Sequence, residues 1–305
     1  MTVLITGGAG TLAGDFLDFW QINSVMEDLV LVDNFSQSSI QANQITYARA
    51  SLIEANCGEL EVMTDLFKKY QPRAILHFAS TMDSSTSGFE SNIRTLLVTL
   101  RAAESTSLPT IFFPQSFLTR DCKQLITDES LLQPEFGDYP LFKALCEQYL
   151  RTYAGKSIVG IISTTLSPRL SIGPIPAFTK RLLGDQPISI SDTKRDYVSP
   201  STVVDAVLRT LEDSFSQKTV VIASGEATST KDIYGSVLAQ LKMTREPEPA
   251  VTPPGVGDPK EILLAPSKSL IETGWDPLYD IEASLQKCVD SVKNSTSEVR
   301  QHHVK

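Results

Sequence analysis

The first fourteen residues constrain the fold more than any other part of the chain, because they join an apolar strand to a glycine-rich turn and a helix start. Gly7, Gly10 and Ala13 follow the run Val3–Thr6 at three-residue spacing. Gly7 suits a tight turn, Gly10 lets a phosphate approach the backbone, and Ala13 permits close packing of the helix on the strand. Amide groups at the helix N-terminus would then face an anion. The segment therefore predicts a dinucleotide pyrophosphate site, although turns also attract glycine for structural reasons alone.

Short apolar runs alternate with longer helical patterns through the first half of the chain. The expected strands are Thr2–Thr6, Leu29–Val32, Ala74–Phe78, Thr110–Phe113 and Ser157–Ser163. The expected helices are Gly10–Asn23, Met63–Tyr70, Ser91–Ser105 and Tyr139–Ala154. Alternation of this kind implies βαβ crossovers, and continuous apolar strands imply burial on both faces. We therefore expect an α/β fold with a Rossmann-type, doubly wound parallel sheet and a smaller, mixed α/β C-terminal substrate lobe.

Prolines break the pattern after Ser163, which suggests where the first domain ends. We expect the Rossmann domain at 1–165, a mainly substrate-binding lobe at 166–290 and a polar tail at 291–305. A strand near 218–223 could return to the first domain. The residues Asn294–Lys305 are polar and are expected to fray.

Composition excludes several classes of function for this chain of 305 residues. A net charge of −9 argues against a nucleic-acid partner, because phosphate neutralisation needs clustered Lys and Arg. The 4 cysteines and 3 histidines lack metal-ligand spacing, so no metal is expected. The chain has no apolar run long enough to span a membrane and no signal-like N-terminus. A cytoplasmic protein with reduced thiols and no membrane partner is expected.

Asp33 ends the second expected strand, twenty residues after Ala13. A carboxylate at this position accepts hydrogen bonds from an adenosine ribose in dinucleotide-binding domains. The segment Asn34–Ser38 contains no Arg or Lys that could hold a 2′-phosphate. NAD is therefore favoured over NADP as the cofactor.

Three further side chains suggest proton transfer. Tyr139 and Lys143 are four residues apart, so they share one face of a helix. A nearby ammonium would lower the pKa of the phenol, which could then act as a general base. Ser116 follows the apolar run at 110–113, at the strand end where ligands bind in open α/β sheets. Each feature alone also occurs without a catalytic role.

The chain resembles the extended short-chain dehydrogenases, particularly the NAD-dependent epimerase/dehydratase group that includes UDP-galactose 4-epimerase. The resemblance rests on the glycine turn, Asp33, Ser116 and the Tyr139/Lys143 pair, and on further segments in the same order. These segments are His77–Ser80, similar to H-x-A-A; Ser91–Thr95, similar to N-V-x-G-T; Arg195–Val198, similar to R-D-[FY]-V; and Thr273–Pro277, similar to L-G-W-x-P. It covers Met1 to about residue 290.

The resemblance implies residue roles in catalysis, cofactor binding and substrate binding. The implied catalytic residues are Ser116, Tyr139 and Lys143. The implied NAD-binding residues are Gly7, Gly8, Ala9, Gly10, Thr11, Leu12, Asp33, Asn34, Ser36, Ser51, Leu52, Phe78, Ala79, Ser80, Tyr139 and Lys143. The implied residues for the nucleotide-diphosphate sugar substrate are Ser116, Thr164, Pro176, Phe178 and Arg195. An intramolecular or surface ion pair is the alternative for Arg195.

The sequence departs from the family pattern near the catalytic serine. The usual S-S-x-x-x-Y-G stretch is here Gln115–Asp121, preceded by Pro114, and it keeps only the catalytic hydroxyl. Ile161 stands near a position where relatives carry arginine. Phe117–Leu118 replace the Asp-Glu pair of the 4,6-dehydratases, and the glutamate of the decarboxylases is also missing, so neither reaction is favoured.

The reaction that the resemblance then favours is reversible oxidation and epimerisation of a nucleotide-linked sugar, at C4 of the sugar. The alternatives are an NAD(P)-dependent reductase of a nucleotide-linked 4-keto sugar and a non-catalytic, NAD-binding regulatory protein.

Relatives also dimerise through two helices, here expected around Ser91–Ser105 and Tyr139–Ala154. Their apolar faces would include Ile93, Leu96, Leu97, Leu100, Leu145, Tyr149 and Leu150. The resemblance thus implies a homodimer, and the alternative is that these side chains face the sheet.

Overall fold

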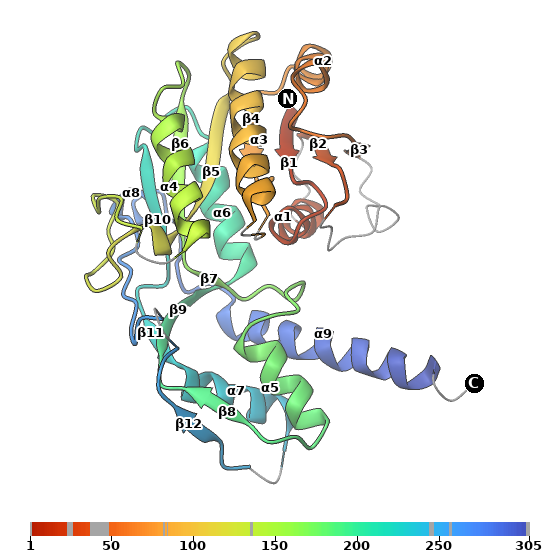
Figure 1. Cartoon of the computed structure of the whole chain (residues 1–305), viewed down its shortest axis with the longest axis vertical. Coiled ribbons are helices and arrows are strands. Elements are labelled where there is room, and N and C mark those ends of the chain that lie inside the picture. Colours follow the sequence, from red (N-terminus) through yellow and green to blue (C-terminus); the bar gives the residue numbers. More distant parts are fainter. Residues whose placement is uncertain are drawn as a thin grey trace.

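The computed structural model describes residues 2–22, 27–36, 49–81, 83, 85–134, 137–243, 247–255 and 258–302. The described chain forms two lobes that lie one above the other (Figure 1). The expected helix end at Asn23 and the last three residues of the expected tail lie outside the described residues.

A seven-stranded parallel sheet forms the centre of the first lobe, in the order β10-β6-β5-β4-β1-β2-β3. The strand order reverses between β1 and β4, which is the topological switch point of a doubly wound fold. The predicted fold class is confirmed. The strands are β1 (Thr2–Thr6), β2 (Asp28–Asp33), β3 (Ala50–Glu54), β4 (Ala74–His77), β5 (Thr110–Ser116), β6 (Ser157–Ile162) and β10 (Thr219–Ile222).

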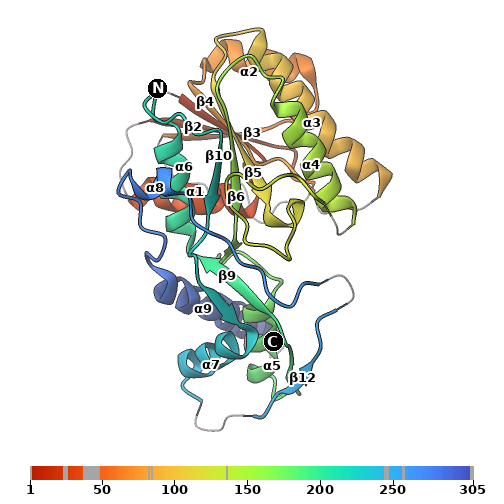
Figure 2. The same ribbon diagram turned by 90° about the vertical axis from the view of Figure 1, so that its left-hand side faces the viewer.

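Helices cover both faces of this sheet, as Figure 2 shows. One face carries α1 (Thr11–Ile22), α6 (Pro200–Thr210) and α8 (Lys268–Ile271). The other carries α2 (Leu60–Tyr70), α3 (Thr86–Glu104) and α4 (Asp138–Leu150). Alternate strand residues enter the two cores: Val3 and Ile5 face α1, whereas Leu4 faces the opposite helices. Continuous apolar strands were therefore the correct signal for burial on both sides.

The second lobe has its own apolar core, built around Phe178, Tyr234 and Val289. Its helices are α5 (Pro174–Leu183), α7 (Thr230–Leu241) and α9 (Ile281–His302). Its strands are β7 (Thr164–Thr165), β8 (Ser189–Ser191), β9 (Lys194–Val198), β11 (Ala227–Ser229) and β12 (Ala250–Thr252).

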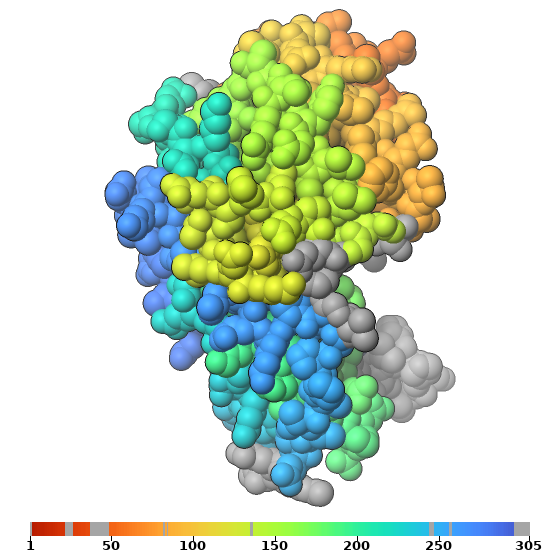
Figure 3. Space-filling model, turned by 60° about the vertical axis from the view of Figure 1, so that its left-hand side comes forward, coloured from red at the N-terminus to blue at the C-terminus, as the bar shows by residue number. Residues whose placement is uncertain are grey.

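The chain passes between the lobes more than once. The strand expected near 218–223 is β10, which pairs with β6 in the first lobe. Helices α6 and α8 also join the first core, although their residues fall within the expected substrate lobe. In Figure 3 the loop after β5 lies against a late segment of the chain, where Ile126 N donates to Leu263 O at 2.9 Å.

The chain was expected to fray from Asn294 onward. This expectation is wrong for the residues up to His302, because α9 continues through them. Its apolar positions Leu285, Val289 and Val292 are buried and recur at helical spacing. Docking of this face extends the helix into the polar sequence that follows.

Candidate active site

The glycine-rich turn connects β1 to α1 as the sequence predicts. Gly7 adopts a φ of +68°, and a Cβ atom on it would lie 2.7 Å from the backbone nitrogen of Ala79. Glycine is therefore required here both for the backbone angle and for the close approach of the neighbouring strand end. Gly10 N donates to Gly7 O at 3.0 Å, and α1 begins at Thr11. The first amides of α1 can face a bound anion.

Asp33 lies at the carboxyl end of β2, beside this turn. Its Oδ2 accepts from the backbone N–H of Ala9 at 2.9 Å, and its Oδ1 accepts from Phe35 at 2.7 Å. Each carboxylate oxygen has further acceptor capacity, so a ribose hydroxyl can also be bound.

A groove of about 110 Å³ runs along the strand ends from Asp33 to the end of β4. We call it the adenosine groove. The predicted cofactor residues that line it are Gly7, Gly10, Asp33, Asn34, Ser36, Phe78, Ala79 and Ser80. Gly8, Ala9 and Thr11 belong to the adjoining turn and helix start.

Ser51 and Leu52, which the resemblance places beside adenine, lie inside β3 and do not line the groove. Asn56 and Cys57 line it instead, just beyond the carboxyl end of β3. Sequence reasoning missed both residues because it did not predict β3. The rule that ligands bind beyond strand ends would have indicated them once that strand was known.

The three predicted catalytic residues come together in a second cavity, of about 320 Å³. We call it the catalytic cavity. Ser116 ends β5, whereas Tyr139 and Lys143 lie on consecutive turns of α4. The remaining lining residues are Leu12, Phe78, Ser80, Pro114, Gln115, Phe117, Ile162 and Ser163. Phe78 and Ser80 line both the catalytic cavity and the adenosine groove, so the two are adjacent.

Lys143 is held against the end of β5. Its Nζ donates to the carbonyl oxygen of Pro114 at 3.0 Å and lies 4.5 Å from the ring centre of Phe113. Burial lowers the pKa of the ammonium to about 8. Pro114 removes a backbone donor from this strand end, yet its carbonyl oxygen accepts a hydrogen bond from Lys143.

Tyr139 packs its ring edge-on against Phe142, with 5.2 Å between ring centres. Burial raises the pKa of the phenol above its ordinary value. The predicted lowering of this pKa by Lys143 is therefore wrong for the chain by itself, where desolvation of the phenolate sets the direction of the shift.

Ser116 precedes a single 3₁₀ turn at Phe117–Thr119, and its Oγ accepts from the N–H of Leu118 at 3.2 Å. Because the oxygen is the acceptor in this bond, the hydroxyl hydrogen can be donated elsewhere. The geometry thus presents Ser116 as a hydrogen-bond donor to an oxygen in the catalytic cavity.

The four other predicted substrate residues are not among those that line this cavity. Thr164 pairs with Tyr197 in the β7–β9 ladder. Pro176 and Phe178 are buried in α5, where the Phe178 ring packs on Tyr234. Arg195 forms an ion pair with Asp258, which is the alternative considered for it. Ile161, near the arginine position of relatives, is fully buried in an apolar cluster with Ile126 and Val221.

A larger cavity of about 450 Å³ lies at the opposite ends of β6 and β10 and is lined by Arg151, Lys156 and Lys218 among others. It contains none of the predicted site residues. The carboxyl ends of the strands, where the glycine turn and Ser116 lie, are the expected position of a ligand site in this fold.

The sequence from 3 to 223 matches the model of the NAD dependent epimerase/dehydratase family. The chain belongs to this family. It is 24% identical to the dTDP-4-dehydro-6-deoxyglucose reductase of Escherichia coli, with 95% of this chain and 97% of that protein covered. It is 22% identical to the UDP-glucose 4-epimerase of Mycolicibacterium smegmatis, with 97% and 100% covered.

Solved structures of other proteins have the same fold. WbmG of Bordetella bronchiseptica, crystallised with NAD, superposes with a TM-score of 0.85 at 25% identity, covering 96% of this chain and 94% of that one. UDP-glucose 4-epimerase of Thermotoga maritima, crystallised with UDP-glucose, gives a TM-score of 0.82 at 22% identity, covering 97% and 100%.

The cofactor is NAD. The chain's own residues fit it: the turn at Gly7–Gly10 for the pyrophosphate, Asp33 for the ribose of the adenosine half, and the adjacent catalytic cavity for the nicotinamide half. Within the described residues, no helix is long and apolar enough to cross a membrane.

Proposed function

We propose that this enzyme epimerises a nucleotide-diphosphate sugar, at C4 of the sugar, through a transient ketone. The observation that carries the proposal is the presence of Ser116, Tyr139 and Lys143 in one cavity beside the adenosine groove. NAD, when bound, supplies a reversible hydride acceptor for this chemistry.

The chain's own groups account for the proton transfers. The phenolate of Tyr139 accepts the proton of the sugar hydroxyl, becoming the phenol, and returns this proton after the ketone has rotated. Ser116 donates a hydrogen bond to the same oxygen. Lys143 places a positive charge beside the phenolate in the reacting complex, which opposes the raised pKa that burial gives Tyr139 in the chain alone.

The lining of the catalytic cavity argues against water elimination. Phe117 lies on the cavity wall immediately after Ser116, and the described residues that line the cavity include no aspartate or glutamate. A 4,6-dehydratase needs a proton donor there, and an apolar ring has no proton to give. Epimerisation needs only the Ser116, Tyr139 and Lys143 groups already present.

The second candidate is one-way reduction of a nucleotide-linked 4-keto sugar. It is favoured by the 24% identity to the Escherichia coli dTDP-4-dehydro-6-deoxyglucose reductase. Asp33 and the absence of Arg and Lys at 34–36 favour NAD over the phosphorylated cofactor; Gln37 and Ser38 lie outside the described residues.

A non-catalytic, NAD-binding role is the third candidate, and it is disfavoured because all three catalytic side chains are retained.

The nucleotide half of the substrate is proposed to bind near Thr164, Pro176, Phe178 and Arg195. For Arg195 this requires a diphosphate to replace or join Asp258 as its partner. Exchange of one anion for another on a guanidinium is chemically reasonable, since both offer paired oxygen acceptors. The homodimer implied by the resemblance remains a proposal as well.

One assay separates these functions. The purified protein is incubated with UDP-, GDP- and dTDP-linked sugars, and with their 4-keto forms plus NADH, while absorbance of reduced nicotinamide and sugar composition are followed. Epimerisation predicts interconverted sugars with no net change in reduced nicotinamide. Stoichiometric loss of NADH with a 4-keto sugar would identify the reductase, and absence of both reactions would refute a catalytic role.

A further inference from the structure

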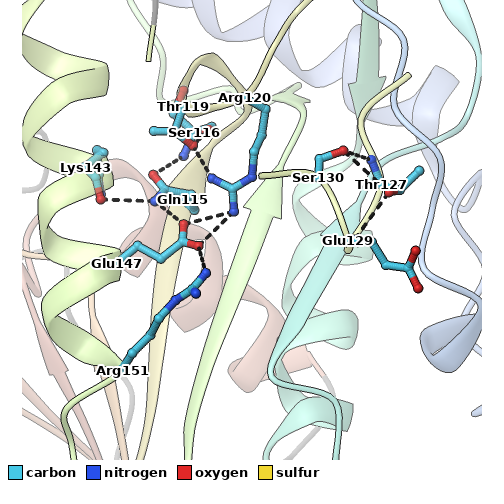
Figure 4. Close-up of polar contacts among 10 residues, drawn as sticks. All are labelled: Gln115, Ser116, Thr119, Arg120, Thr127, Glu129, Ser130, Lys143, Glu147 and Arg151. Atoms are coloured by element: carbon cyan, nitrogen blue, oxygen red, sulfur yellow. Dashed lines mark hydrogen bonds and ion pairs between the residues drawn. The ribbon is translucent and has the colours of Figure 1, made fainter. Parts of the chain in front are cut away.

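Three polar side chains are buried behind the catalytic serine. Gln115, Arg120 and Glu147 are 2%, 1% and 0% exposed, respectively. Gln115 and Arg120 occupy the positions of the first serine and the tyrosine in the family's S-S-x-x-x-Y-G stretch. Figure 4 shows that both side chains reach Glu147 on α4. Gln115 and Arg120, which both depart from the family pattern, therefore contact the same carboxylate.

The amide of Gln115 has a single orientation that satisfies all its partners. Its Nε2 donates to the backbone oxygen of Lys143 at 3.1 Å and to Oε2 of Glu147 at 2.7 Å. Its Oε1 accepts from the N–H of Ser116 at 2.9 Å. A flipped amide would place a donor against the Ser116 donor and an acceptor against two acceptors. One side chain thus links the backbones of two catalytic residues.

Glu147 fixes the far side of this amide. Arg120 Nη2 donates to both its carboxylate oxygens, at 2.9 and 3.0 Å, in a fully buried pair. Arg151 also approaches Oε1 at 3.3 Å, but its side chain is 61% exposed. A buried, doubly bonded carboxylate has little freedom to move, so it is a rigid support for Gln115.

Arg120 also reaches Ser116 by a second route. Its Nη1 donates to Thr119 Oγ1 at 2.8 Å, and that hydroxyl donates to the carbonyl oxygen of Ser116 at 2.7 Å. Ser116 is therefore held through its N–H by Gln115 and through its carbonyl by Thr119. Both supports lead back to the Arg120–Glu147 pair.

We propose that Gln115, together with the Arg120–Glu147 pair, is a positioning unit that sets Ser116 relative to Lys143. Although Gln115 also lines the catalytic cavity, by this assignment the unit acts through the backbones of Ser116 and Lys143 and not on the reacting atoms. It rests on the proposed function, because the relevant geometry is that of the proton-transfer group. In this chain Gln115 and Arg120 stand where the family pattern has a serine and a tyrosine, and from these positions they support Ser116.

The primary test is Gln115→Met, which keeps the approximate size of the side chain and removes all three hydrogen bonds. Arg151→Gln is the matched control, because it breaks only the exposed contact to Glu147. We expect kcat of Gln115→Met to fall about 10- to 100-fold, with KM and NAD affinity little changed. The control should keep the kcat of the unaltered protein.

A second variant guards against misfolding of the first. Single removal of Arg120 or Glu147 would leave an unpaired buried charge, whereas the double change Arg120→Met/Glu147→Leu replaces the pair by apolar side chains of similar size. This double variant is expected to melt near the temperature of the unaltered protein yet to lose kcat as Gln115→Met does. A lower melting temperature with unchanged kcat per folded molecule, in both variants, would overturn the proposal.

Hydrogen exchange gives a readout that does not need turnover. In the NAD-bound protein, the segment 114–119 should exchange faster in Gln115→Met and in the double variant than in the unaltered protein or Arg151→Gln. Unchanged exchange in both would also overturn the positioning role. If the unaltered protein turns over no nucleotide sugar, the proposed function fails, and exchange alone then decides the positioning role.

Discussion

The carboxylate of Asp33 accepts a hydrogen bond from the backbone N–H of Ala9 at 2.9 Å, so the end of β2 holds the glycine-rich turn directly. The same carboxylate is proposed to bind the adenosine ribose. One side chain therefore holds the turn proposed for the pyrophosphate and would, by this proposal, also contact the neighbouring part of the cofactor.

Asp33→Ala should weaken NAD binding by at least about tenfold in Kd, since it removes both the ribose contact and the bonds to Ala9 and Phe35. Isothermal titration with NAD measures this. Asp28→Ala is the control, because Asp28 begins the same strand and pairs with Arg49 at the surface. Equal affinities for NAD in the unaltered protein and Asp33→Ala would place the ribose elsewhere.

Tyr139→Phe should reduce turnover by about 10²- to 10⁴-fold, the usual contribution of a general acid–base group, while NAD remains bound. Initial rates measure the effect, with the nucleotide-linked sugar that the incubation assay described above shows to be turned over. Tyr149→Phe removes a phenol from the exposed side of the same helix and should have no such effect. Retained activity in Tyr139→Phe would exclude the proposed base.

Asp15 gives a pH dependence of stability that can be measured without substrate. It is 4% exposed on α1, and burial raises its pKa from 3.8 to about 7. The folded state therefore holds a proton that the unfolded state has lost, and this stabilisation disappears as pH rises from about 4 through 7. Its loss corresponds to at most about 4 kcal/mol.

Asp15→Asn cannot ionise, and its amide oxygen can still accept from Ser167, as Asp15 Oδ1 does at 2.9 Å. Its melting temperature should exceed that of the unaltered protein by an amount that is smallest near pH 4 and grows until about pH 7. Asp18→Asn, on the exposed side of α1, should not reproduce this rise. A difference independent of pH would show that Asp15 does not titrate in this range.

The exposed apolar face of α4 tests the proposed dimer. Leu141, Leu145 and Tyr149 are 44%, 45% and 44% exposed and recur at four-residue spacing. Leu145→Lys should convert a dimer to a monomer in light scattering, whereas Leu131→Lys, at a residue that is 84% exposed outside α4, should not. A monomer before any substitution would refute the dimer.

Part of the predicted dimer face belongs to the core instead. Leu96, Leu100 and Leu150 are buried against the sheet, whereas Leu145 and Tyr149 are exposed, with Ile93 and Leu97 between these extremes. Spacing along a helix identifies an apolar face but does not say which neighbour covers it.

The central strands could be predicted from sequence, and β3 could not, for a physical reason. The interior strands are buried on both sides and appear as unbroken apolar runs such as Val3–Ile5. β3 lies at the sheet edge with Ser51 and Glu54 exposed, so its apolar signal is interrupted. Missing this strand also concealed Asn56 and Cys57.

That Ser116, Tyr139 and Lys143 line one cavity was predictable, because their spacing reflects shared helical and strand-end geometry. The positioning unit was not, because Gln115, Arg120 and Glu147 are residue types that usually face solvent. Only the packing of α4 on β5 brings Glu147 to Gln115 and makes their burial favourable.

The return of β10 to pair with β6 has a consequence for how the protein can be made. The first lobe cannot fold completely before α6, β10 and α8 have been synthesised. Residues of α6 and β10, and Leu270 of α8, are part of its apolar core. A fragment cut after β6 would present an unpaired, apolar strand to solvent and would tend to aggregate. We therefore expect the first lobe to fold only as part of the longer chain that also contains the second lobe.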